Sequence, residues 1–349
     1  MNKIALILLV FTLFSCQGKR EGENTSEKHM EPSCHTETNA IYFWKTVCTL
    51  NSADRKFLDD NNIQRAYVRF FDIVPDTSPL AVEEIIPNAS LQMKDSLPVS
   101  EIVPTIFITQ DALNRMDGKY NIWADKIVTR VRAMCSYNEL PEPEEIQLDC
   151  DWTEDSQNNF FELCREVKEC LTQQDPTALL SATIRLHQLS QEAPPVDYGV
   201  LMLYNTGSFR NISEKNSILS KETVEPYLKN LPSYPLHLDI AYPTYSWQLL
   251  FHNNQFVGII RQELSENDEA LQNIDGSHVK VVKDVLIGDL HLKTGDVIRV
   301  ERSDFNTIKE VKDLVDKLLQ SKPHSNIIYH LDSKNLSNYT EDEIKAIYH

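Results

Sequence analysis

Eight short apolar segments recur along this chain, and patterns typical of helices separate several of them. The segments are 41–47, 65–71, 102–109, 146–151, 180–186, 199–204, 236–241 and 326–331. The helical patterns lie at 123–135, after Ser156, at 220–231, at 306–319 and after Thr340. Strands that alternate with helices form parallel sheets with the helices packed outside. Residues 41–349 therefore predict an α/β fold, a (β/α)8 TIM-type barrel.

The predicted barrel has two irregular sides. Residues 73–101 contain several prolines in place of a clear helical pattern, and residues 187–198 leave room for little more than one helical turn. A doubly wound open sheet is the alternative fold. It is disfavoured because the glycine-rich first turn typical of that fold is absent from the sequence.

Residues 1–16 are typical of a targeting segment. A lysine precedes the apolar run 4–14, which is too short to span a bilayer and has the length of a signal-peptide core. The run ends in Leu-Phe-Ser-Cys16, which resembles the lipobox of bacterial lipoproteins and implies cleavage before Cys16 and acylation of its thiol. A plain secretory signal is the alternative. Residues 17–40 are polar without apolar periodicity and predict a flexible tether, so we expect a lipid-anchored protein of the bacterial cell envelope, at the outer membrane.

The composition excludes several classes of function. The 349 residues include 52 acidic and 34 basic side chains, giving a formal net charge of −18, whereas nucleic-acid binding requires a basic face. No GxGxxG, GxxxxGK[ST] or HExxH motif occurs, and we expect neither a cofactor nor a metal. The seven cysteines show no CxxC or Cys/His ligand spacing, so most are expected to be small buried apolar side chains.

The fourth apolar segment is followed by acids, and its sequence from Ile146 reads IQLDCDWTE. Asp149 and Asp151 are two residues apart and share one face of a strand, while Cys150 lies on the other face. Carboxylates directed into a sheet interior are costly to desolvate unless they have a function there. An ordinary strand end with solvated acids explains this segment alone equally well.

In a barrel of this kind, the active-site residues lie at the C-terminal ends of the strands. Charged and aromatic side chains are expected at those ends here. Flat rings cover the apolar face of a sugar and charged groups pair with its hydroxyls, so the set predicts a carbohydrate site that binds an oligosaccharide or polysaccharide. The expected substrate-binding residues are Trp44, Lys45, Arg69, Asp72, Trp152, Arg185, His187, Asn205, Asp239, Tyr245 and Trp247.

Two short motifs resemble those of family-18 chitinase-like glycoside hydrolases. The segment 148–152, followed by an acid, is similar to the strand-four signature DxxDxDxE of that family. The segment 199–205, with Met202 and Tyr204, is similar to its sixth-strand MxYD motif. The resemblance implies the (β/α)8 barrel and a glycan substrate, and the chain as a whole resembles uncharacterised barrel lipoproteins related to that clan.

The resemblance also implies a small α+β insertion after the seventh strand, at about residues 248–304. A hairpin pattern at 251–262, centred on Asn253-Asn254, and a second strand pair expected around 293–296 agree with such an insertion.

The sequence departs from the family pattern at the acids. Ile146 stands where the family has its first Asp, Thr153 where it has the proton-donating Glu, and Asn205 where the sixth-strand motif has Asp. A threonine hydroxyl cannot protonate a leaving group. The expected catalytic residues are therefore Asp149, Asp151, Glu154 and Tyr204. Glu154, one residue after the family's acid position, is the expected proton donor.

Three functions agree with these observations, because a fold does not fix an activity. In the first, the barrel hydrolyses a glycan by acid/base catalysis, and the separation of its two carboxyl groups decides between retention and inversion. In the second, the barrel has lost catalysis and binds a glycan. In the third, it is an interaction scaffold of the envelope.

Overall fold

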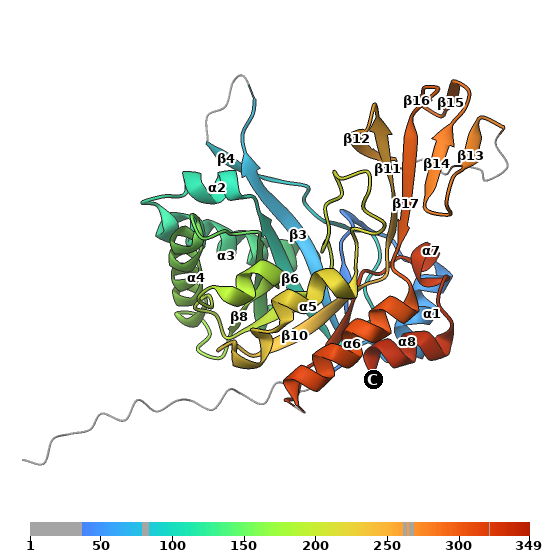
Figure 1. Cartoon of the computed structure of the whole chain (residues 1–349). Helices are drawn as coiled ribbons and strands as arrows, with labels where there is room; N and C mark the ends of the chain where they lie inside the picture. The colour runs from blue at the N-terminus through green and yellow to red at the C-terminus, as the bar shows by residue number, and fades with distance from the viewer. Residues whose placement is uncertain (1–36, 79–83, 261–263, 265–268, 321) are drawn as a thin grey trace, which may run out of the picture. The chain divides into compact units, whose positions relative to one another are not determined.

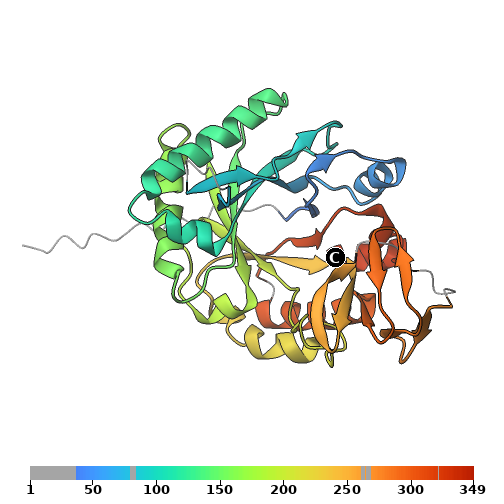
Figure 2. The ribbon, with the colours of Figure 1, turned by 90° about the horizontal axis from the view of Figure 1, so that it is seen from above.

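Eight parallel strands close into a barrel (Figure 2). The computed structural model describes residues 37–78, 84–260, 264, 269–320 and 322–349. The barrel strands are β1 (Ala40–Phe43), β3 (Arg65–Pro75), β6 (Glu101–Ile108), β7 (Glu145–Cys150), β8 (Leu179–Arg185), β9 (Tyr198–Met202), β10 (Leu238–Pro243) and β18 (Asn326–Tyr329). The sheet closes because β1 pairs with both β18 and β3. The predicted (β/α)8 barrel is confirmed, and an open sheet is excluded.

Helices pack against the outside of the barrel (Figure 1). They are α1 (Ser52–Asp60), α2 (Gln110–Arg115), α3 (Tyr120–Tyr137), α4 (Gln157–Thr172), α5 (Lys221–Leu228), α6 (Phe305–Leu319), α7 (Ser333–Leu336) and α8 (Glu341–Tyr348), with 3-10 turns η1 (Leu186–Ser190) and η2 (Leu231–Ser233). The apolar stripe of α4 is buried, as its spacing predicts. Thr340 and Glu343 form the predicted capping box of α8.

The two irregular sides are also confirmed. Strand β3 extends beyond the barrel and pairs antiparallel with β4 (Ile85–Asn88). Strand β5 (Gln92–Met93) pairs with β2 (Val47–Cys48). The described part of residues 73–101 therefore contains strands and no helix. On the other side, η1 is the short turn expected between β8 and β9.

The insertion after β10 is a five-stranded antiparallel sheet with a separate hairpin, standing beyond the upper end of the barrel in Figure 1. Its strands are β11 (Ser246–His252), β12 (Gln255–Ile260), β13 (Leu271–Asn273), β14 (His278–Val281), β15 (Val285–Ile287), β16 (Leu290–Leu292) and β17 (Val297–Arg302). The hairpin around Asn253-Asn254 is confirmed.

Two details of the predicted insertion differ from the structure. The expected strand pair around 293–296 is wrong: β16 pairs with β15, whereas β17 pairs with β11 and β14. The residues between β16 and β17 form a turn that redirects the chain, and a turn alone does not specify which strands pair. The insertion was expected to be α+β, and its described residues, 246–260, 264 and 269–302, form strands and turns without a helix.

The barrel interior contains both apolar and polar side chains. Val200, Met202 and Ala241 are among its buried apolar residues. Towards the N-terminal ends of the strands, Glu145 is fully buried and accepts hydrogen bonds from Ser181 (2.5 Å) and from the Tyr198 hydroxyl. This polar layer lies at the N-terminal end of the barrel, opposite the end where an active site is expected.

The predicted lipidation site, Cys16, lies outside the described residues, as does Cys34. Strand β1 begins at Ala40, the last residue of the expected tether. The cysteines of the described part are free and most are buried, which agrees with small apolar packing residues. No helix in the part of the chain that the structure describes is long and apolar enough to cross a membrane.

Candidate functional site

A pocket of about 330 Å³ opens at the C-terminal ends of β7, β8 and β9. We call it the mouth pocket. It is lined by Gln110, Asp151, Thr153, Arg185, Leu186, His187, Tyr204, Asn205, Thr206 and Tyr227. Five of the residues expected from the sequence are therefore brought together here: Asp151, Arg185, His187, Tyr204 and Asn205. The volume lies at the small end of the range for ligand pockets.

Arg185, at the end of β8, holds both acids of β7. Its Nη2 donates to Asp149 Oδ1 at 2.8 Å, and its Nε donates to Asp151 Oδ1. Asp149 also accepts a hydrogen bond of 2.5 Å from the Thr183 hydroxyl. The period of two predicted correctly that both acids share the inner face of the strand, with Cys150 buried on the outer face. Both carboxylates are thus engaged by one guanidinium.

The charges of this cluster are set by burial and by the ion pairs. Burial raises the pKa of Asp149, and this effect is opposed by the Arg185 guanidinium and the Thr183 hydrogen bond. Burial lowers the pKa of Arg185, but Asp149 and Asp151 more than reverse this, so the net shift is upward and Arg185 stays cationic. Burial also raises the pKa of Tyr204 well above its usual value, which keeps its hydroxyl protonated.

The expected proton donor is not in the pocket. Thr153, which stands at the family's acid position, lines the mouth pocket, and its N–H donates to Ser156 Oγ at 2.9 Å. Glu154 lies in the turn before α4, is exposed, and is not one of the pocket-lining residues. The only carboxylate among the residues that line the mouth pocket is therefore Asp151, which Arg185 already binds.

Aromatic rings extend from the mouth pocket across the end of the barrel. Tyr204 lies 4.6 Å from Tyr329 and 6.0 Å from Tyr245, measured between ring centroids. Trp44 lies 5.9 Å from Tyr329. The Tyr245 hydroxyl donates to Asn205 Oδ1 at 2.8 Å, which ties the ring cluster to the pocket rim. A cluster of this kind offers flat apolar faces with polar edges.

The other expected charged residues at this end each have a charged partner. Arg69 donates to Asp72 Oδ1 through Nε at 2.8 Å, and its guanidinium lies 5.5 Å from the centroid of the Trp44 ring. Lys45 Nζ lies 3.9 Å from Asp332 Oδ2. Within the described residues, no group of three or more His, Cys, Asp or Glu side chains has an arrangement suited to a metal.

The substrate-binding role expected for Trp152 is wrong. Its side chain is fully buried outside the barrel, with ring centroids 6.1 Å from Phe160 and 5.5 Å from Phe161 of α4. The alternation that directs Asp149 and Asp151 inward directs Cys150 and Trp152 outward. The backbone carbonyl of Trp152 accepts a 2.8 Å hydrogen bond from the side chain of Gln188 in η1.

Two more expected residues lie away from the mouth pocket. Asp239 is the second residue of β10, near the N-terminal end of the barrel, where it is fully buried and accepts a 2.7 Å bond from the Ser325 N–H. Strand β10 continues to Pro243, so Asp239 is four residues from the end that carries the pocket. Trp247 belongs to β11 of the insertion, where Nε1 donates to Glu301 Oε2 at 2.6 Å.

Five pocket residues were not expected from the sequence: Gln110, Thr153, Leu186, Thr206 and Tyr227. Leu186 comes directly after β8 and Gln110 two residues after β6, so a search that extends two residues past each strand finds them. Thr206 directly follows Asn205, which was expected from the sequence. Tyr227 belongs to α5 and is 41% exposed, and helical spacing alone does not show that this ring reaches the barrel end.

The fold and this pocket define a TIM-type barrel protein with a pocket of mainly polar residues and two tyrosines at the C-terminal ends of its strands. The chain is similar to the spore cortex-lytic enzyme SleL of Bacillus cereus, at 12% identity and a TM-score of 0.53, over 90% of this chain and 74% of that one. It is also similar to a chitinase of Chromobacterium violaceum, at 10% identity and a TM-score of 0.52, over 89% of this chain and 98% of that one.

These likenesses are of fold, because so few residues are identical. They show that the chain shares a TIM-type barrel fold with these two proteins. No protein-family model matches the sequence, and no curated protein sequence matches it.

Proposed function

We propose that the mouth pocket binds a glycan containing N-acetylhexosamine units and does not hydrolyse it. The observation that carries this proposal is the engagement of both Asp149 and Asp151 by Arg185. Hydrolysis requires one carboxyl group free to donate a proton and a second group to assist. In the mouth pocket the acid position is Thr153, whose hydroxyl is too weak an acid to protonate a leaving group near neutral pH.

Binding is supported by the composition of the pocket. The Tyr204 hydroxyl and the Asn205 amide can exchange hydrogen bonds with sugar hydroxyl or acetamide groups. The exposed ring of Tyr227 offers a flat face to a pyranose. The fold likeness to a chitinase and to a cortex-lytic enzyme supports the choice of an amino-sugar polymer.

Direct measurement of affinity tests the binding proposal. We expect the chain from residue 17 onward to bind chitotetraose, and Tyr227→Ala to weaken binding about tenfold because a stacking face is lost. The matched control is Tyr137→Ala, which removes an exposed helical tyrosine on α3 and should leave affinity unchanged. Isothermal titration calorimetry gives the three dissociation constants. Absence of binding by the unaltered chain contradicts the proposal.

We also propose that Cys16 carries a lipid that anchors the barrel to a membrane of the bacterial envelope. The signal-like run 4–14 and the Leu-Phe-Ser-Cys16 motif support this proposal. Replacement of the thiol, Cys16→Ser, should move the protein from the membrane fraction to the soluble fraction after expression in a bacterium. Retention of this variant in the membrane fraction at the level of the unaltered protein would argue against lipid anchoring.

A further inference from the structure

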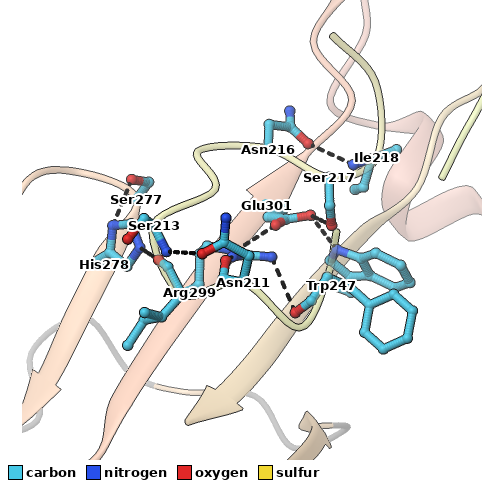
Figure 3. Close-up of polar contacts among 12 residues, drawn as sticks. Asn211, Ser213, Asn216, Ser217, Ile218, Trp247, Ser277, His278, Arg299 and Glu301 are labelled. Atoms are coloured by element: carbon cyan, nitrogen blue, oxygen red, sulfur yellow. Dashed lines mark hydrogen bonds and ion pairs between the residues drawn. The ribbon is translucent and has the colours of Figure 1, made fainter. Parts of the chain in front are cut away.

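The loop between β9 and α5 lies against the insertion, and side chains of the insertion hold its backbone (Figure 3). Arg299 of β17 donates to the Asn211 carbonyl through Nη1 and to the Phe209 carbonyl through Nη2 at 3.3 Å. His278 of β14 donates through Nε2 to the Ile212 carbonyl at 3.0 Å. These contacts fall within residues 209–212, so the central part of the loop is fixed to the sheet of the insertion.

The charge of Arg299 is balanced by Glu301, two residues along the same strand. Both side chains are fully buried, and Arg299 Nε lies 2.5 Å from Glu301 Oε1. Glu301 Oε2 also accepts hydrogen bonds of 2.7 Å from Ser217 Oγ and 2.6 Å from Trp247 Nε1. Removal of one partner of a buried ion pair strongly destabilises the folded protein, because the other charge is left buried and unpaired. The Arg299–Glu301 pair is therefore expected to stay formed in the folded protein. Arg299 thus holds the middle of the loop, and Glu301 holds its end at Ser217.

The start of the same loop forms part of the mouth pocket. Asn205 and Thr206 line the pocket, and Asn205 adopts a left-handed backbone conformation with φ of 54°. The Gly207 N–H donates to the Ser217 carbonyl at 3.1 Å, so the two ends of the loop are joined. Space at this junction is small: a Cβ on Gly207 would come within 3.1 Å of the Ser217 Cα. A loop whose ends are joined in this way is a compact Ω-type loop.

We infer that Arg299 and Glu301 are positioning residues for the mouth pocket, which hold the β9–α5 loop so that Asn205 and Thr206 face the bound glycan. The inference rests on the glycan-binding function proposed above. The insertion then acts as a rigid support for one wall of the pocket. Fixing a binding loop in advance reduces the ordering that the ligand must otherwise impose, and so strengthens binding.

The test compares two changes on neighbouring residues of β17. Arg299→Met removes the contacts to the loop, while Ile298→Ala removes a buried side chain from the opposite face of the sheet, in the core of the insertion, without touching the loop. Glu301→Gln is a milder variant that keeps the side-chain shape if Arg299→Met fails to fold. For each protein, hydrogen exchange of residues 205–219 and the dissociation constant for chitotetraose are measured.

We expect Arg299→Met and Glu301→Gln to increase amide exchange in the loop and to weaken chitotetraose binding about tenfold. Ile298→Ala should increase exchange in β14 and β17 while changing affinity by less than about twofold. Faster loop exchange with unchanged affinity overturns this inference and leaves the glycan-binding function intact. If the unaltered protein fails to bind chitotetraose, both proposals fall, and an unchanged loop exchange overturns the inference by itself.

Discussion

At the scale of single residues, Glu145 is a buried carboxyl group whose surroundings strongly raise its pKa. Burial raises the pKa of Glu145 from 4.5 to about 7, against the opposing effects of Arg65 and of hydrogen bonds from Ser181 and Tyr198. The folded protein therefore binds this proton more tightly than the unfolded chain. The contribution to stability is fully present below about pH 4.5 and is lost as the pH rises towards 7.

Glu145→Gln should remove this part of the pH dependence. The shift corresponds to about 3 kcal/mol between pH 4.5 and pH 7 or above. We expect the free energy of unfolding, measured with urea at a series of pH values, to fall less steeply over this interval in the variant than in the unaltered protein. Parallel curves for the two proteins would show that Glu145 does not titrate in this way.

Residue patterns predicted which side chains share a face, but not which side chains meet. The alternation of two placed Asp149 and Asp151 together and Cys150 opposite them, all as found. The same alternation, applied one step further, directs the Trp152 side chain away from the pocket, as the structure shows. The Arg185 contacts join residues 34 and 36 positions apart, and no local pattern encodes such a pairing.

At the scale of elements, the hairpin of β11 and β12 depends on its two-residue turn. Asn253 and Asn254 adopt left-handed backbone conformations, with φ of 49° and 62°, as a tight hairpin turn requires. Asparagine tolerates this region, whereas a β-branched residue does not. Turn chemistry is why this hairpin could be predicted from the sequence.

Asn254→Val should therefore destabilise the hairpin by about 1–2 kcal/mol. Hydrogen exchange of the β11 and β12 amides measures this loss directly. Gln255→Val is the matched control, because Gln255 is exposed and lies in the extended strand, where valine is favoured. Equal exchange rates in the two variants would contradict the role given to the turn.

The pairing order of the insertion was harder to predict than the barrel. In the barrel each strand pairs with its neighbour in sequence, except where β18 returns to β1 and where the insertion intervenes. In the insertion β17 lies between β11 and β14, so its partners are distant in the sequence. Distant pairing is decided by packing over the whole sheet, which apolar alternation alone does not determine.

At the scale of the whole molecule, the barrel gathers at one end residues that are far apart in the sequence. Asp151, Arg185 and Tyr204 meet in the mouth pocket because parallel strands in a closed ring place their C-terminal ends together. The sequence predicted this convergence once the ring was assumed. The size of the pocket, and the exclusion of Glu154 from it, depend on loop conformations that strand patterns do not specify.

The central claim, that the mouth pocket binds a glycan without cleaving it, is tested most directly by following a bound substrate over time. Reducing-end-labelled chitotetraose is incubated for a day with the chain from residue 17 onward, at a protein concentration that keeps most of the sugar bound. Mass spectrometry then records the length of the labelled sugar. We predict that the tetramer is bound and stays intact. A labelled product shorter than the tetramer, formed faster than without protein, would contradict the account.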